Sequence, residues 1–198
     1  MKKFLSVILL GAGLTIAAQP KKAPKMAPIL AEGYYVNSKN DTVVGNIQAN
    51  PESETEFYQK FYFQPAKGGK IMPVDPKKAK AYGFDGRHFV LLASGDGLYI
   101  ERLASGRLNL FEYKYDGKVD GYDHIVSDYY MQDTRAEGSD IKLKEINKIS
   151  NKFYKKDLKP YMKDQLMLWT DLDKFTFDKQ AVISAINEFN KFYAITAN

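Results

Sequence analysis

Residues 88–113 read HFVLLASGDGLYIERLASGRLNLFEY, and this stretch decides the fold. It holds three runs of β-forming residues, at 88–92, 98–103 and 107–113. Serine and glycine separate each run from the next, and these residues favour tight turns. Short strands that recur about every ten residues, with turn signals between them, are typical of an antiparallel meander. We therefore expect a sandwich or a partly open barrel.

The segments on either side extend this pattern. Gly33–Val36 and Thr42–Ile47 flank a cluster of turn formers, which predicts a hairpin. An extended strand over 57–63 would place its phenylalanines on one face and Tyr58 and Tyr62 on the other. Further strands are expected at 71–74, 79–84, 129–134 and 141–144, with a loop at 116–123. The antiparallel β region would span residues 32–146.

The hydrophobic period changes after about Asn147, where a C-terminal helical segment (147–198) of the same domain is expected. One helical face would hold Phe153, Leu158, Tyr161 and Met162. Pro160 implies that the helix kinks or restarts at that position. Residues 165–169 suggest a short second helix. In the last helix, Asp178 is the expected N-cap and an apolar stripe runs to about residue 195. Because these helices are too short to form their own core, we predict an α+β domain with the helices packed on the sheet.

The N-terminal residues predict export. Residues 1–18 combine two lysines, an apolar run and a small-residue end, the pattern of a cleaved signal peptide. An N-terminal membrane helix is the alternative, although the run is shorter than the roughly 20 residues needed to span a bilayer. Residues 19–31 are rich in proline and lysine and are expected to be a flexible tether. A periplasmic or secreted protein is predicted, with no transmembrane segment in the mature chain.

Composition narrows the possible functions. The chain has no cysteine, which excludes disulfides, thiol nucleophiles and the acylated cysteine of a lipoprotein. Its net charge is +5, but the first 31 residues hold five of the 29 basic and none of the 24 acidic residues. The remainder is therefore neutral, which argues against a nucleic-acid partner. Nucleotide-binding glycine motifs are absent and the two histidines are far apart, so no cofactor is expected.

Aromatic residues supply the first candidate site. The sequence has 14 tyrosines and 12 phenylalanines. Exposed tyrosines on a sheet could stack on sugar rings or form a partner interface. The candidate ligand-binding residues are Tyr34, Tyr58, Tyr62 and Tyr99. The alternative is that these side chains belong to the core and to cross-strand packing.

Carboxylates supply two further hypotheses. Asp116, Asp120 and Asp123 alternate with glycines, and hard oxygens on a bent loop suit calcium. Ordinary hairpin turn chemistry explains the same residues. A pair of acids could also serve a hydrolase, although the spacing favours no particular pair. The candidates for that pair are Glu101, Glu112, Asp85 and Asp96.

Three segments taken together resemble a widespread family of uncharacterised secreted proteins of the Bacteroidota. They are Gly33–Ile47, Ile71–Asp75 with Ala81–Gly86, and the helical end at Glu188–Asn190. The first is similar to that family's GYxV…DTVxGxI hairpin, apart from Asn40 where the family tends to have glycine, and Phe189 stands where it has tyrosine. The resemblance implies the envelope or exterior of a Gram-negative bacterium and no particular activity.

The sequence favours an exported, non-catalytic binding module for a protein partner or a surface glycan. An extracytoplasmic hydrolase with a carboxylate pair is the main alternative. A calcium-stabilised, adhesion-like domain is the weaker one.

Overall fold

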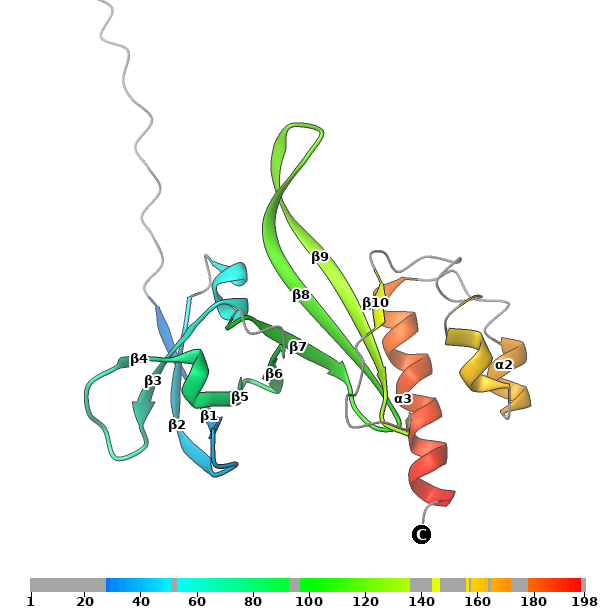
Figure 1. Cartoon of the computed structure of the whole chain (residues 1–198), viewed down its shortest axis with the longest axis horizontal. Helices are drawn as coiled ribbons and strands as arrows, with labels where there is room; N and C mark the ends of the chain where they lie inside the picture. Colours follow the sequence, from blue (N-terminus) through cyan, green and yellow to red (C-terminus); the bar gives the residue numbers. More distant parts are fainter. Residues whose placement is uncertain are drawn as a thin grey trace, which may run out of the picture.

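A computed structural model shows a single antiparallel sheet with helices at one end (Figure 1). It describes residues 28–50, 53–92, 97–135, 144–146, 156, 158–163, 165–171 and 178–196. Ten strands lie in the order β10-β9-β8-β7-β6-β5-β1-β2-β3-β4. They are β1 (Ile29–Asn37), β2 (Thr42–Ala49), β3 (Phe61–Pro65), β4 (Met72–Val74), β5 (Ala79–Phe84), β6 (Arg87–Leu91), β7 (Tyr99–Ala104), β8 (Leu108–Val119), β9 (Tyr122–Asp133) and β10 (Lys144–Ile146).

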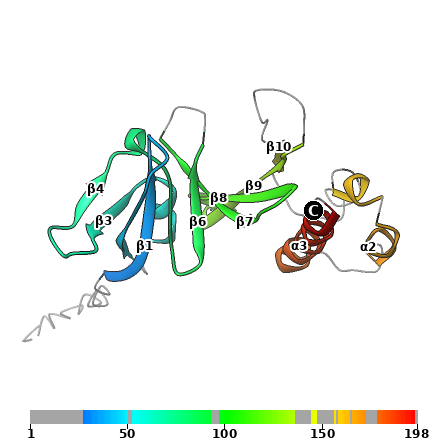
Figure 2. The same cartoon turned by 90° about the horizontal axis from the view of Figure 1, so that it is seen from below.

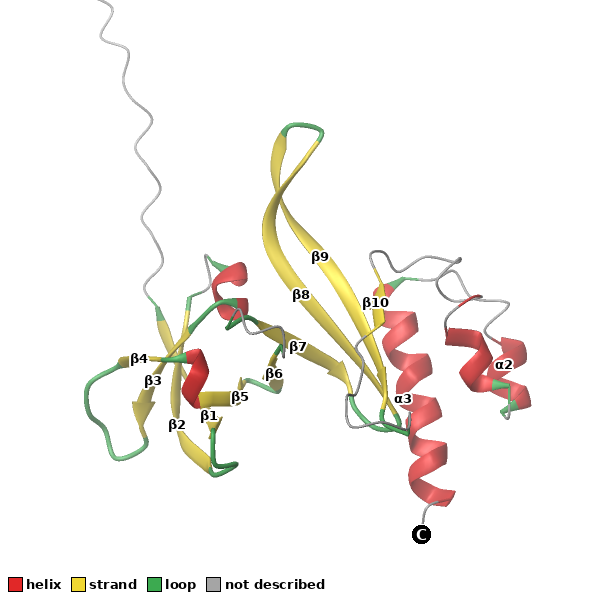
Figure 3. Ribbon diagram, in the orientation of Figure 1, coloured by secondary structure: helices red, strands yellow, loops and turns green. Residues whose placement is uncertain are grey.

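The predicted α+β architecture is confirmed. Strands β5 to β10 form the meander in chain order, whereas β1 inserts next to β5 and leads outward through β2 and β3 to β4. The sheet curls at its β1–β5 end, and the α-helices gather at the other end, as Figures 1 and 2 show together. Figure 3, coloured by element type, also shows short 3₁₀ helices beside the curled strands. The predicted signal peptide and most of the predicted tether, residues 1–27, lie outside the described residues, but Ile29–Ala31 of the predicted tether belong to β1.

Two segments differ from expectation. Phe57 and Tyr58 lie in the 3₁₀ helix η1 (Glu54–Tyr58) instead of a strand, so their side chains do not alternate between two faces. The predicted loop at 116–123 consists of the ends of β8 and β9. These strands pair without a break from Leu108 opposite Asp133 to Val119 opposite Tyr122. Asp120 and Gly121 alone form the turn, with φ of 52° and 85°, as a two-residue hairpin turn of type I′ requires.

The sheet carries two hydrophobic cores. The first fills the curled end, where the Tyr82 ring stacks between Phe61 (centroids 4.1 Å apart) and Phe89 (4.7 Å), and Tyr99 meets it edge-on. A short 3₁₀ turn, η2 (Pro76–Lys78), leads into β5 beside this core. The second core lies where Leu108, Leu110 and Met131 of β8 and β9 meet the C-terminal helix. The two cores are separate, so other contacts hold together the strands that lie between them.

The C-terminal helix is α3 (Lys179–Thr196), preceded by η4 (Lys159–Met162) and α2 (Leu166–Asp171). Asp178 caps α3, since its Oδ1 accepts a hydrogen bond from Ala181 N at 2.7 Å. This cap and the short helix near 165–169 were both predicted. The expected helical turns around Phe153 lie outside the described residues. No helix in the described part is both long and apolar enough to cross a membrane.

Asn190 fastens α3 to the sheet. Its side chain accepts from Leu108 N (2.9 Å) and donates to Leu108 O (2.8 Å), as a neighbouring strand would. Gly106 permits this approach, because a Cβ at that position would lie 2.5 Å from Asn190 Cγ. Arg107 adds to the contact by lying over the Phe189 ring (5.2 Å) and the Tyr193 ring (4.2 Å).

Candidate functional site

The four candidate tyrosines do not form one exposed cluster. Tyr58 and Tyr99 are fully buried, so the expectation that they bind a ligand is wrong. Tyr58 is buried because η1 turns it into the core instead of leaving it on a strand's outer face. The Tyr99 hydroxyl donates to Ala79 O at 3.2 Å inside the same core. Tyr34 on β1 and Tyr62 on β3 are half-buried.

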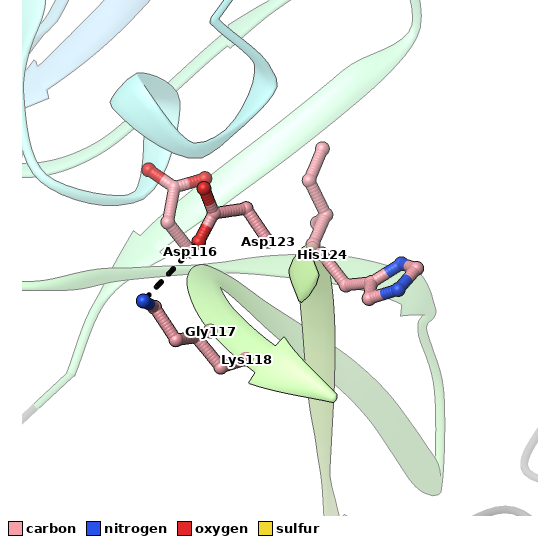
Figure 4. A pocket seen from close by; sticks show the side chains of 6 residues that line it. Asp116, Gly117, Lys118, Asp123 and His124 are labelled. Atoms are coloured by element: carbon pink, nitrogen blue, oxygen red, sulfur yellow. Dashed lines mark ion pairs between the residues drawn. The ribbon is translucent and has the colours of Figure 1, made fainter. Parts of the chain in front are cut away.

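The three candidate aspartates lie at the far end of the β8–β9 hairpin. A pocket of about 490 Å³ lies there, and its lining residues, drawn in Figure 4, are Asp116, Gly117, Lys118, Asp123, His124 and Ile125. Asp116 accepts a hydrogen bond from Thr55 Oγ1 of η1 at 3.1 Å. Asp123 forms a long ion pair with Lys118 at 4.0 Å, and His124 points away from both carboxylates (Figure 4).

This arrangement does not form the proposed calcium site. Asp120 sits in the turn and does not line the cavity. Among the described residues, no three Asp, Glu or His side chains are grouped closely enough to hold a metal ion. The loop expected to wrap around calcium is instead a regular ladder, in which successive side chains point to opposite faces.

The same hairpin exposes large apolar side chains near its tip. Tyr122 is 73% exposed, Ile125 54% and Val119 48%. Val119 and Tyr122 are directly opposite in the ladder and share one face, whereas Ile125 lies on the other face, opposite Asp116. In Figure 1 the β8–β9 hairpin projects beyond the other strands of the sheet. The Asp-Gly pair between alternating residues is the sequence signal by which this ribbon could have been anticipated.

A charged cluster occupies the sheet between the two cores. Glu101 and Glu112 are directly opposite on β7 and β8. Arg87 donates two hydrogen bonds to the Glu101 carboxylate, one from Nε (2.8 Å) and one from a terminal nitrogen (2.7 Å). The Tyr58 hydroxyl donates a third to Glu101 at 2.9 Å. The same guanidinium lies over the Phe89 ring, 4.9 Å from its centroid. Glu101 is thus held on several sides by residues of the chain itself.

Glu112 is held in the same way. It is 1% exposed, and Lys179 at the start of α3 binds it at 2.6 Å. The Tyr129 hydroxyl donates to it at 3.0 Å, and burial together with this carboxylate raises the pKa of Tyr129 to about 12. The Lys114 ammonium lies 3.9 Å away. The pair Glu112–Lys179 therefore links the helix to the middle of the sheet.

Glu54 completes the cluster from η1. It accepts hydrogen bonds from Arg87 (2.7 Å) and from Lys114 (3.0 Å). Burial alone would raise the pKa of Glu54, but the hydrogen bonds and positive charges of Arg87 and Lys114 outweigh it and lower that pKa. The cluster thus balances three carboxylates with three cations: Glu54, Glu101, Glu112, Arg87, Lys114 and Lys179.

This balance gives Glu101 and Glu112 a structural role. A glycosidase pair needs one carboxyl that can give a proton to a substrate and a second that faces the same sugar. Both carboxylates here are occupied by Arg87 and Lys179, and neither lines the cavity at the hairpin tip. Of the other acids considered for this role, Asp85 lies in the β5–β6 turn with φ 48°, and Asp96 lies outside the described residues.

No family model, curated protein or solved structure matches this chain.

Proposed function

We propose that this protein is an exported, non-catalytic binding module that recognises a protein partner with the tip of its β8–β9 hairpin. One observation carries the proposal: the hairpin projects beyond the other strands of the sheet and exposes Val119, Tyr122 and Ile125 near its turn. Two-stranded ribbons on their own are only marginally stable in water. A ribbon that also exposes its largest apolar side chains gains stability when a partner covers them.

The distribution of these side chains indicates the kind of contact. Because Val119 and Tyr122 lie on one face and Ile125 on the other, a flat partner surface could cover only part of the apolar area. A groove that encloses the tip would cover both faces. Fully burying one such side chain contributes about 1.5–3 kcal/mol, so the three half-exposed groups supply roughly 3 kcal/mol of binding free energy.

The charge of the tip favours a protein groove over a lipid surface. Residues 116–125 contain three aspartates and one lysine, a net charge of −2. Anionic lipid headgroups would repel this segment. A groove with basic residues at its rim would match it, because complementary charge speeds association and suppresses wrong partners.

Export is supported by the first residues of the sequence and by composition. Residues 1–18 have the three-part pattern of a signal peptide, and the chain lacks cysteine for a lipid anchor. We expect the exported protein to begin near Gln19 in the periplasm or outside the cell. N-terminal sequencing of protein recovered from the periplasmic and extracellular fractions tests this, and an intact Met1 would contradict it.

Site-specific photo-crosslinking tests the partner proposal. Benzoylphenylalanine replaces Tyr122 at the tip or, as a control, Lys67, which is exposed in the β3–β4 connection. Irradiation of intact cells should give one discrete protein adduct from the tip position and none from the control. Adding Val119→Asp should remove the adduct. Equal adducts from both positions, adducts with lipid only, or an adduct insensitive to Val119→Asp would refute the proposal.

A further inference from the structure

A second feature lies on the outer face of the sheet, on strands that do not belong to the hairpin. Tyr35 packs its ring against Phe63 in the curled core, with centroids 4.9 Å apart, so its neighbour Tyr34 projects to the opposite face. Tyr34 is directly opposite Gly83 on β5, and Gly83 is directly opposite His88 on β6. One row thus crosses three strands.

Gly83 allows the two rings of this row to meet. A Cβ at Gly83 would lie 2.9 Å from both Cζ and the hydroxyl oxygen of Tyr34, so the end of the tyrosine ring rests on the backbone of β5. The Tyr34 hydroxyl reaches across it to Nδ1 of His88, at 2.6 Å. The two ring planes lie within 29° of each other, with centroids 6.0 Å apart. Together they form an aromatic platform joined by a hydrogen bond.

Charged side chains surround the platform. Tyr34 and His88 line a shallow pocket of about 280 Å³ together with Glu32, Asp85, Arg87 and Arg102. Within the described part of the chain, Arg87 pairs with Glu54 and Glu101, whereas Glu32, Asp85 and Arg102 have no ion-pair partner. In the central cluster, by contrast, every charge is matched. Burial and the nearby Arg102 charge lower the pKa of His88 to about 4, so the platform is neutral at pH 7.

We propose that this pocket is a carbohydrate-binding site, with the Tyr34–His88 platform stacking against a sugar ring. The apolar C–H face of a pyranose packs against a flat aromatic surface, and its hydroxyl groups both donate and accept hydrogen bonds. Glu32 and Asp85 supply acceptors, and Arg102 supplies donors. In small-ligand sites, polar groups of this kind fix the orientation of the ligand.

The charges of the pocket argue against other ligands. Arg87 is already paired with Glu54 and Glu101, so the pocket offers a ligand two carboxylates and one further guanidinium, and this balance would repel a phosphate or a free carboxylate. The pocket also lacks three acids or histidines grouped for a metal ion, as does the rest of the described chain. Its volume is near the lower end for ligand pockets, which suits one or two sugar units.

The two histidines of the chain allow a direct test. In protein labelled with ¹⁵N-histidine, His88 reports on the pocket and His124 on the hairpin as an internal reference. The probes are soluble oligosaccharides of glucose, mannose, galactose and N-acetylglucosamine, with inorganic phosphate and diglycine as separate arms. At least one oligosaccharide should shift the His88 imidazole signals and leave those of His124 unchanged.

Variants assign the effect to the platform. Tyr34→Ala should weaken that binding at least about tenfold, as loss of a central aromatic contact does. Tyr34→Phe keeps the ring and should weaken binding only a few-fold, which guards against a folding defect in the alanine variant. Tyr62→Ala, at another half-buried tyrosine that does not line this pocket, is the matched control and should bind normally.

Four results would overturn the proposal. The first is that no oligosaccharide shifts the His88 signals at about 10 mM, a concentration that detects even millimolar affinity. The second is a shift with phosphate or diglycine alone, and the third is an equal shift of His88 and His124. The fourth is unchanged binding in Tyr34→Ala.

Discussion

Removing Arg87 should destabilise the fold more than the loss of any surface charge. Its guanidinium binds Glu101 and Glu54 and lies over the Phe57, Phe84 and Phe89 rings at 4.9–5.7 Å. Arg87→Met keeps much of the side-chain volume but removes the charge. Glu101 would then retain only the Tyr58 hydroxyl among the partners described above, at a position close to Glu112.

The magnitude follows from burial. Breaking a buried ion pair by removing one partner costs about 3–5 kcal/mol. The Arg87 side chain is 24% exposed and that of Glu101 11%, so the lower end of this range, about 3 kcal/mol, is expected. For a domain of this size, that corresponds to a fall in Tm of about 6–12 °C.

Urea denaturation followed by tryptophan fluorescence and circular dichroism measures the free energy of unfolding. The control is Lys118→Met, because the Lys118–Asp123 pair is 74% and 92% exposed and should contribute nothing measurable. Arg87→Met combined with Glu101→Leu should be less destabilised than the sum of the single variants by roughly 0.5–3 kcal/mol, since neither charge is left alone. A loss below about 0.5 kcal/mol for Arg87→Met would refute the reasoning.

Three further predictions concern pH, the helix contact and metal. His88 has a pKa of about 4 when folded and near 6.5 when unfolded, so the unfolded chain binds more protons between these values. The free energy of unfolding should therefore fall by about 2 kcal/mol as the pH drops from 6.5 to 4, a value that allows for the partial exposure of His88. In His88→Asn, the urea midpoint should change less with pH over this range. Asn190→Ala should lower the free energy of unfolding by about 2–4 kcal/mol, because it leaves the buried N–H and C=O of Leu108 unpaired. A scanning-calorimetry profile like that of the wild type would contradict this. Calcium or EDTA should leave Tm unchanged, and a rise with calcium would restore the Asp116, Asp120 and Asp123 hypothesis.

The overall architecture could be predicted because it depends on local patterns. Alternating β-forming runs with glycine turns specify the meander, and the apolar stripe after Asp178 specifies the last helix. The errors occurred where a local pattern has two interpretations. The Phe57–Tyr58 pair fits an extended strand as well as a 3₁₀ turn, and the acids around Asp120 fit a metal loop as well as a hairpin. In both cases, long-range pairing and burial decided between them.

The sequence alone determined which chemistry is available: no thiols, a neutral body behind a lysine-rich N-terminus, and an abundance of tyrosine. Only the tertiary structure decided which of these residues meet. Glu101 faces Glu112, and Tyr34 reaches His88 over Gly83, because strand register brings together residues that are distant in the chain. Register depends on the packing of the whole sheet, and a shift of one residue would turn each of these side chains to the opposite face. The same physical cause buried Tyr99 while leaving Tyr34 beside a pocket.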